Sequence, residues 1–107
     1  MKFPVDIKKF IQTQETLEGR SLPPSARELC ERFLRASNTV YYRALYGEIS
    51  GNPFDGDIAE NMRRIWKERN EEEPCNSTVI FEIIAVLKTW GEMAFEQGVA
   101  DRKETSA

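Results

Sequence analysis

Basic and aromatic side chains are interleaved between residues 35 and 46 of this chain of 107 residues. The segment contains Arg35 and Arg43 together with Tyr41, Tyr42 and Tyr46. Guanidinium groups bind phosphate oxygens, and tyrosine rings can stack on nucleotide bases. These residue types predict contact with a polyanion. Tyr41 and Tyr46 could instead pack at the margin of the core with their hydroxyl groups in water; we favour this for Tyr46 and leave Tyr42 open.

The charge distribution agrees with a polyanion-binding surface in the first half of the chain. Residues 1–47 hold eight Lys and Arg against five Asp and Glu, whereas residues 48–107 hold seven against thirteen. The first part is therefore mildly basic, although the whole chain has a formal net charge of −3. An uneven distribution of this kind favours a local anion-binding face over a generally basic protein.

The residue types argue against catalysis and metal binding. The chain has no histidine, and its two cysteines, Cys30 and Cys75, form no CxxC pair. This excludes a histidine general base and an ordinary zinc site. Asp55, Asp57 and Glu60 are explained by a turn and a helix cap, because the further oxygen ligands of a calcium loop are missing. We predict a protein that is not an enzyme and needs neither a metal nor a cofactor.

Helical spacing of apolar residues predicts an all-α fold. We expect a single small bundle of four to five helices over residues 1–100, followed by a frayed tail over residues 101–107. The first helix runs from about residue 4 or 6 to Glu18 and stops at Gly19, a residue typical of helix ends. The others are expected from Ser25 to about residue 36, from about Thr39 to Tyr46, from about residue 57 onwards, and over residues 77–97.

The last of these helices is the most apolar. Its apolar residues cover most of the circumference: Val79, Ile80, Phe81, Ile83, Ile84, Val86, Leu87, Trp90, Met93 and Phe95. A helix of this kind is either central in a bundle or shared with a second subunit. The remaining helices offer only a modest apolar area to cover it. We therefore expect a homodimer formed through the Ser77–Gln97 helix.

Two capped helices are predicted to meet at a tight corner within Ser25–Leu45. Ser25 and Glu28 have the spacing of a capping box, and Ser37 or Asn38 can cap the next helix. Four segments then resemble the helix-turn-helix of bacterial repressors: Arg27-Glu28-Leu29, Glu31-Arg32-Phe33, Ser37-Asn38-Thr39-Val40 and Arg43-Ala44-Leu45. This resemblance spans about a fifth of the chain. It departs from the pattern at Leu34, because that turn position is usually glycine.

The resemblance implies that the second helix enters the major groove of DNA. Ser37, Asn38, Thr39 and Tyr41 would then face bases or adjacent phosphates, with Arg35 and Arg43 on the backbone. Tyr42 belongs to the same candidate surface. A secondary basic patch is predicted on the following helix, at Arg63, Arg64 and Lys67. The resulting hypothesis is a small regulatory protein that contacts duplex DNA or RNA through this basic and aromatic corner.

A second hypothesis belongs to another class of function. The apolar side chains of residues 77–97 could bind a protein partner, which would make the chain a non-enzymatic adaptor or inhibitor. No apolar run is long enough to cross a membrane, and the first residues contain no apolar core of a secretion signal. We therefore expect a cytoplasmic protein with reduced thiols and no membrane association.

Overall fold

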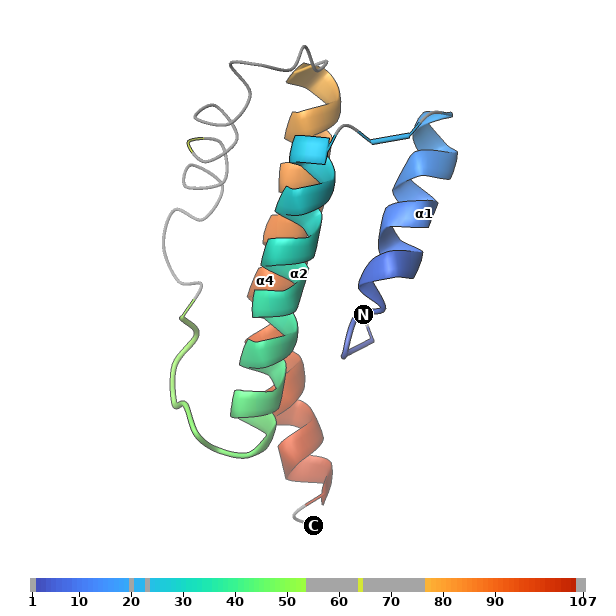
Figure 1. Ribbon diagram of the computed structural model, residues 1–107. Helices are drawn as coiled ribbons and strands as arrows, with labels where there is room; N and C mark the ends of the chain where they lie inside the picture. The colour runs from blue at the N-terminus through green and yellow to red at the C-terminus, as the bar shows by residue number, and fades with distance from the viewer. Residues whose placement is uncertain (1, 20, 23, 54–63, 65–76, 106–107) are drawn as a thin grey trace.

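The fold is all-α, as the sequence predicted. The computed structural model describes residues 2–19, 21–22, 24–53, 64 and 77–105, and within this part of the chain there are helices and no strands. Three helices have defined bounds: α1 (Ile7–Glu18), α2 (Pro24–Leu45) and α4 (Ser77–Thr105) (Figure 1). The helix predicted from about residue 57 lies outside the described residues, apart from Arg64, which is helical.

The helix α1 begins and ends where local sequence signals place its limits. The Asp6 carboxylate accepts a hydrogen bond from the Lys9 backbone N–H at 3.1 Å, which satisfies one of the free donors of the first turn. Gly19 ends the helix with a φ of 69°, a left-handed conformation that a residue without Cβ adopts at little cost. The prediction of Gly19 as the stop of the first helix is confirmed.

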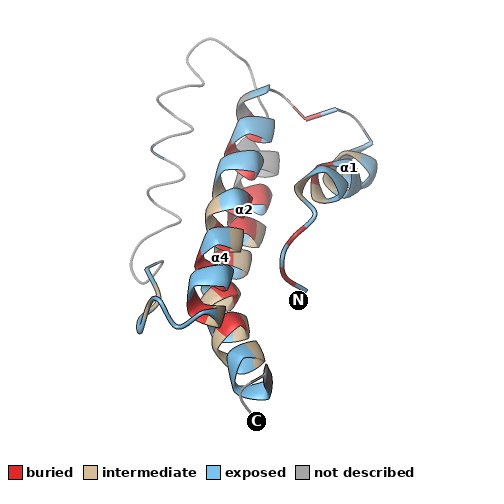
Figure 2. Cartoon of the chain, turned by 60° about the horizontal axis from the view of Figure 1, so that its bottom comes forward, coloured by how far each residue is buried: buried red, intermediate tan, exposed pale blue. Residues whose placement is uncertain are grey.

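The helices α2 and α4 form a parallel pair that makes up most of the bundle. Both run from the top to the bottom of Figure 1, and α4 packs along α2 far more extensively than α1 does. The helix α1 runs in the opposite direction beside them. The buried residues gather along the α2–α4 contact and on the N-terminal segment (Figure 2). This core consists of Phe3, Val5, Ile11, Leu22, Ala26, Leu29, Cys30, Leu34, Val40, Tyr41, Ala44, Ile83, Ile84, Leu87 and Ala94.

The predicted corner within residues 25–45 is absent, because α2 is one uninterrupted helix from Pro24 to Leu45. Its buried side continues through the expected break at steps of three and four residues, at Cys30, Leu34, Ser37, Tyr41 and Ala44. The Ser37 hydroxyl does not cap a new helix. It donates to the Phe33 carbonyl of the preceding turn at 2.9 Å, so it is satisfied inside a continuous helix. The prediction of two short helices in this segment is therefore wrong.

The helix α4 is long, but its described side chains are not apolar all round. Ile83, Ile84 and Leu87 are buried, whereas Glu82, Ala85, Lys88, Thr89, Glu92 and Glu96 are exposed. The helix also continues to Thr105, so the prediction of a frayed tail from Asp101 is wrong over residues 101–105. One turn of α4 lies unusually close to α2. A Cβ atom on Gly98 would stand 2.5 Å from the Tyr41 carbonyl oxygen.

Candidate nucleic-acid interface

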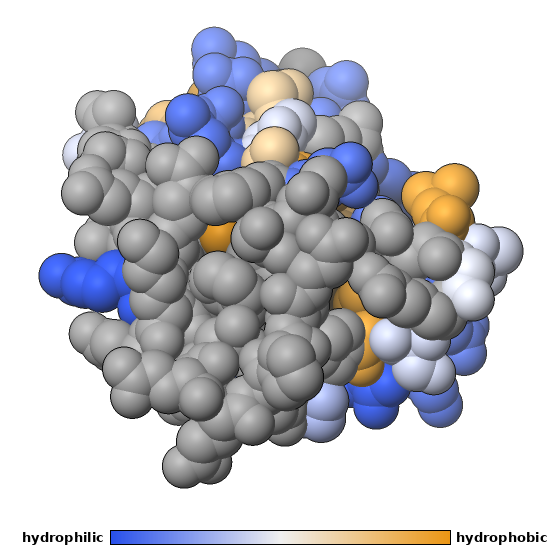
Figure 3. All heavy atoms as spheres, turned by 90° about the horizontal axis from the view of Figure 1, so that it is seen from above, coloured by the Kyte–Doolittle hydropathy of each residue, from blue (hydrophilic) through white to orange (hydrophobic). Residues whose placement is uncertain are grey.

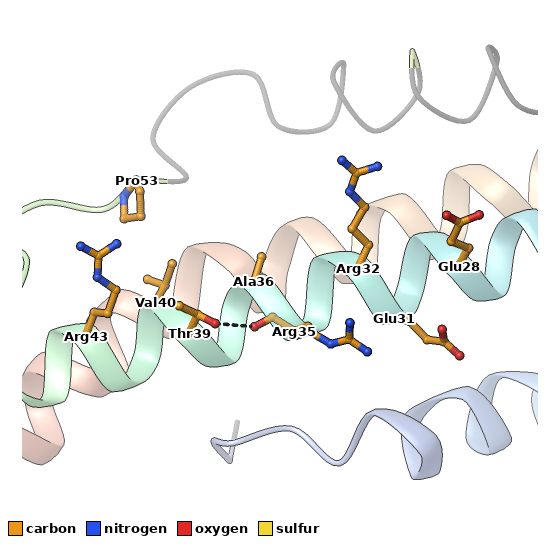
Figure 4. Close-up of a pocket in the computed structure, with 9 residues that line it drawn as sticks. All are labelled: Glu28, Glu31, Arg32, Arg35, Ala36, Thr39, Val40, Arg43 and Pro53. Atoms are coloured by element: carbon orange, nitrogen blue, oxygen red, sulfur yellow. Dashed lines mark hydrogen bonds between the residues drawn. The ribbon is translucent and has the colours of Figure 1, made fainter.

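The outer face of α2 presents a line of cationic side chains. Arg32, Arg35, Thr39 and Arg43 follow one another at steps of three, four and four residues, and all four are exposed. Such spacing places them along one side of an α-helix, over about 16 Å of its axis. They line a groove of about 810 Å³, together with Glu28, Glu31, Ala36, Val40 and Pro53 (Figure 4). We call Arg32, Arg35 and Arg43 the arginine row.

The arginines of the row are only weakly engaged by the protein itself. Arg43 Nε lies 3.7 Å from Glu48 Oε2, and both side chains are more than half exposed. An exposed pair of this kind contributes about 0–1 kcal/mol to stability and is easily replaced by another anion. Arg32 and Arg35 form no ion pair with any other residue that the structure describes. The row therefore has guanidinium groups available for an external anion.

Arg35 stands on the ridge between two grooves. In Figure 4, Arg32 and Arg43 point to the same side of α2 as Pro53, whereas Arg35 points towards the other side, where α1 lies. It also lines a second groove of about 540 Å³ between α1 and α2, which Lys8, Gln12 and Arg27 share. In this second groove Arg27 is already paired, since its Nη2 lies 3.4 Å from Glu15 Oε2. Arg35 is therefore accessible from both grooves, whereas Arg32 and Arg43 line only the first.

Two of the predicted base-contacting residues are structural. Ser37 is 1% exposed, and its hydroxyl is bonded within α2. The Asn38 side chain clamps the N-terminal segment: Val5 N–H donates to Asn38 Oδ1 at 2.7 Å, and Asn38 Nδ2 donates to the Val5 carbonyl at 3.0 Å. These groups are turned into the protein and are not available to base edges. The predicted placement of Ser37 and Asn38 at bases is corrected accordingly.

Tyr41 is also buried, and it links α2 to α4. Its hydroxyl donates to Asp101 Oδ2 at 2.6 Å, and Gln97 Nε2 donates to the other oxygen of that carboxylate at 2.8 Å. The hydrogen bond to Asp101, together with burial, stabilises the neutral phenol and raises the pKa of Tyr41 to about 12. The hydrogen bonds from Tyr41 and Gln97 lower the pKa of Asp101, because they favour its charged form.

We expect the free energy of unfolding to decrease in alkaline solution, in part because of Tyr41. A tyrosine in the unfolded chain ionises near pH 10, whereas folded Tyr41 stays neutral up to about pH 12. The stabilisation is therefore complete below about pH 10 and is lost as the pH rises towards 12. Urea denaturation of the wild type and of Tyr41→Phe should show a difference in stability that shrinks from about pH 8 to about pH 11.

The Tyr41→Phe variant also separates this effect from that of Cys30. Burial raises the pKa of the Cys30 thiol to about 12, so this group acts in the same direction and over a similar range. Both proteins retain Cys30, and its contribution cancels in the difference between them. A difference in stability that stays constant with pH would contradict the assigned role of the Tyr41–Asp101 hydrogen bond.

The remaining predicted residues are exposed at the surface of α2 or beyond it. Tyr42 is 40% and Tyr46 69% exposed, and their rings lie 6.3 Å apart at an interplanar angle of 13°. Tyr46 is thus at the surface and not at the core margin, where we expected it. Thr39 is exposed, although its hydroxyl donates to the Arg35 carbonyl at 3.1 Å. In the predicted secondary patch Arg64 is exposed, while Arg63 and Lys67 lie outside the described residues.

Sequence reasoning missed Arg32 as a member of the site. The predicted corner divided residues 25–45 into two helices. The sequence therefore did not define on which side of a common helix Arg32 and Arg43 would lie relative to each other. In one continuous helix they are eleven residues apart, which is close to three full turns and puts them on the same side. The spacing of 32, 35 and 43 was visible in the sequence. It indicates a common face only once the helix is known to be unbroken.

Among the described residues there is neither a cluster of metal-binding side chains nor a helix that could span a membrane. Within residues 2–19, 21–22, 24–53, 64 and 77–105, no three His, Cys, Asp or Glu side chains are grouped as a metal site would require. Among the same residues no helix is both long and apolar enough to span a membrane. The free thiol of Cys30 is buried, and its raised pKa disfavours the reactive thiolate.

Comparison with known proteins assigns the chain to no family. No protein-family model, no curated protein and no solved structure matches it. Its function must therefore be argued from the arrangement of its own side chains, of which the arginine row and the exposed tyrosines are the most distinctive.

Proposed function

We propose that the protein is a small nucleic-acid-binding regulatory protein that contacts the phosphate backbone of duplex DNA or RNA through the arginine row. The observation that supports this most directly is the pair Arg32 and Arg35. Both are exposed on α2, Arg32 towards the Pro53 side and Arg35 towards α1, and neither forms an ion pair with a carboxylate of the described residues (Figure 4). Guanidinium groups form two parallel hydrogen bonds with phosphate oxygens, which suits them to this role.

The proposed contact is with phosphates and not with base edges. Base recognition needs side chains that project donors and acceptors into a groove, and Ser37 and Asn38 are committed inside the protein. Arginines along the side of a helix can follow a backbone without reading its sequence. We therefore expect binding that depends strongly on salt and weakly on base sequence.

We expect the double variant Arg32→Ala/Arg35→Ala to bind duplex nucleic acid about tenfold or more weakly. Each phosphate contact releases counterions and contributes about 0.9 to the slope of log K against log salt concentration for B-DNA. The double variant should therefore lower the magnitude of this slope by about two. Fluorescence anisotropy with a labelled duplex at several salt concentrations measures both quantities.

A matched control removes the same charge from other faces of the molecule. The variant Lys9→Ala/Lys88→Ala also loses two exposed cations, one from α1 and one from α4, where Lys88 Nζ lies 3.8 Å from Glu92 Oε1. It should keep its affinity within about twofold, because a distant exposed charge acts weakly through salt solution. Equal losses in the two double variants would show a nonspecific charge effect, and no loss in the arginine variant would remove the proposal.

The alternative, an adaptor or inhibitor that uses apolar surface of α4, has less support. In the described part of α4, Ile83, Ile84 and Leu87 are buried within the protomer, and Trp90, Met93 and Phe95 are half-buried against the core. In the end-on view of Figure 3, the described atoms that are visible are mostly hydrophilic, with hydrophobic atoms in a few places, but this view does not show the length of α4. The homodimer through Ser77–Gln97 stays a prediction, since the burial of Val79, Ile80 and Phe81 lies outside what the structure describes.

A further inference from the structure

We infer that Tyr42 and Tyr46 form a stacking platform that continues the arginine row, so that the preferred ligand contains unpaired nucleotides. This inference rests on the proposed function, because the arginine row supplies the phosphate contacts beside the platform. It goes beyond that proposal in naming the kind of nucleic acid: a single strand, or a duplex with a single-stranded overhang.

Tyr42 lies on α2 in nearly the same direction as Arg35, and Tyr46 directly follows Leu45, the last residue of that helix. In a helix of 3.6 residues per turn, Arg35, Tyr42 and Tyr46 fall within an arc of about 40°. Arg32, Thr39 and Arg43 occupy the adjoining arc of about 40°. Tyr46 follows Arg43 by three residues, or about 4.5 Å along the helix axis. A nucleotide with its phosphate at Arg43 would therefore have its base beside the tyrosine pair.

The platform is held in place from within the protein. Tyr42 contacts the buried Tyr41 ring edge-on, with the ring centroids 5.3 Å apart. Tyr41 is itself fixed by its hydrogen bond to Asp101 and by stacking on Phe3, with centroids 5.3 Å apart and an interplanar angle of 17°. The exposed rings are thus the outer end of an aromatic cluster that begins in the core. Pre-positioned rings lose little conformational entropy when a ligand binds.

Exposed tyrosine faces match an unpaired base better than a base pair. Bases inside a duplex are stacked on their neighbours, whereas an unpaired base has a free aromatic face, whatever its identity. Two carboxylates of this region are engaged by other side chains, and a phosphate at Arg43 would displace Glu48. Glu48 pairs with Arg43, and Asp101 is held by Tyr41 and Gln97. Interleaved arginines and aromatic rings are the combination that single-stranded nucleic acid binding requires.

The test compares three ligands and two double variants. The ligands are a labelled single-stranded oligonucleotide, its blunt duplex, and the same duplex with a 3′ overhang. Tyr42→Ala/Tyr46→Ala should weaken binding of the single strand and of the overhang duplex by about 10- to 100-fold, since stacking contributes about 1–3 kcal/mol per base. It should change blunt-duplex affinity by less than about twofold. Tyr42→Phe/Tyr46→Phe keeps the rings and should bind all three ligands as the wild type does.

A second readout does not depend on a substitution. Photo-cross-linking of wild-type protein to a single strand containing 5-iodouracil should modify Tyr42 or Tyr46, identified by mass spectrometry of the peptides. An alanine variant that binds the single strand normally, or cross-links confined to other parts of the protein, would overturn the inference. So would equal losses for the single strand and the blunt duplex.

The outcomes also separate this inference from the proposed function. If duplex binding requires Arg32 and Arg35 while the affinity for the single strand is unchanged in Tyr42→Ala/Tyr46→Ala, only the inference of the platform fails. If the wild type binds neither DNA nor RNA in any of the three forms, the proposed function fails and the platform with it. In that case the exposed tyrosines would be available to a protein partner instead.

Discussion

Replacing Leu34 by glycine should lower the free energy of unfolding by about 3–6 kcal/mol. Leu34 is fully buried in the middle of α2. Truncating a buried leucine to alanine costs about 2–5 kcal/mol through lost contacts and the remaining cavity. Glycine adds about 1 kcal/mol, because it is disfavoured in a helix interior. Denaturation by guanidinium chloride, followed by circular dichroism, measures the change.

This substitution distinguishes the continuous helix from the helix-turn-helix that the sequence resembles. In that motif the position of Leu34 is the turn and usually holds glycine, so Leu34→Gly would be tolerated. The control Glu31→Gly is made at an exposed position of the same helix and should cost only about 1 kcal/mol. If the two glycine variants were equally stable, the uninterrupted course of α2 would be contradicted.

Adding a side chain at Gly98 should separate α2 from α4 and destabilise the protein. A Cβ atom there would lie 2.5 Å from the Tyr41 carbonyl oxygen and 2.7 Å from Ala44 Cβ. Backbone atoms cannot move away as a flexible side chain can. We expect Gly98→Ala to cost about 1–3 kcal/mol despite its higher helix propensity, and Gly98→Leu to cost more.

The matched control for this series is Ala100→Leu. Ala100 is exposed on the same helix, so the larger side chain extends into water and stability should change by less than about 0.5 kcal/mol. The melting temperatures of the three variants, compared with that of the wild type, give the order of the effects. A Gly98→Leu protein as stable as the Ala100→Leu protein would show that the two helices are not in close contact at this level.

Local patterns were sufficient to predict the helical class and the limits of α1. The start near Asp6 and the stop at Gly19 are both encoded within a few residues of the places where they act. The helix that starts at Ser77 was also expected from its apolar content, and its observed start agrees. Its extension to Thr105 was missed because polar residues dominate the final turns. There Asp101 is bonded to Tyr41, which is 60 residues away in the sequence.

The false corner in α2 has a similar origin. Ser37 and Asn38 are common helix caps, so their adjacency favoured a break. In the structure neither residue caps a helix. The Ser37 hydroxyl donates to the Phe33 carbonyl, and the Asn38 side chain forms hydrogen bonds with the backbone of Val5. The partner of Asn38 is 33 residues away, and no local pattern reveals it. Tertiary contacts therefore decided between two locally acceptable conformations.

The candidate site was predicted in part. The sequence identified Arg35, Arg43 and the tyrosines, because residue type alone suggested their chemistry. It could not show which tyrosines would be buried, since Tyr41 and Tyr42 are adjacent and differ only in the side of the helix they occupy. Because the helix is uninterrupted, Tyr41 faces the core and bonds to Asp101, whereas Tyr42 and Tyr46 are exposed.

Because α2 and α4 are parallel, the negative C-terminal poles of their two helix dipoles lie at the same end of the bundle. Each C-terminal end has a partial charge of about −0.5, and antiparallel neighbours would have compensated for it. Here the compensation comes from cations in the last turns, namely Arg43 in α2, and Arg102 and Lys103 in α4. The Arg102 guanidinium occupies the space beside Gly47, just beyond the last residue of α2. A cation of the final turns of α4 thus lies close to the negative pole of the neighbouring helix.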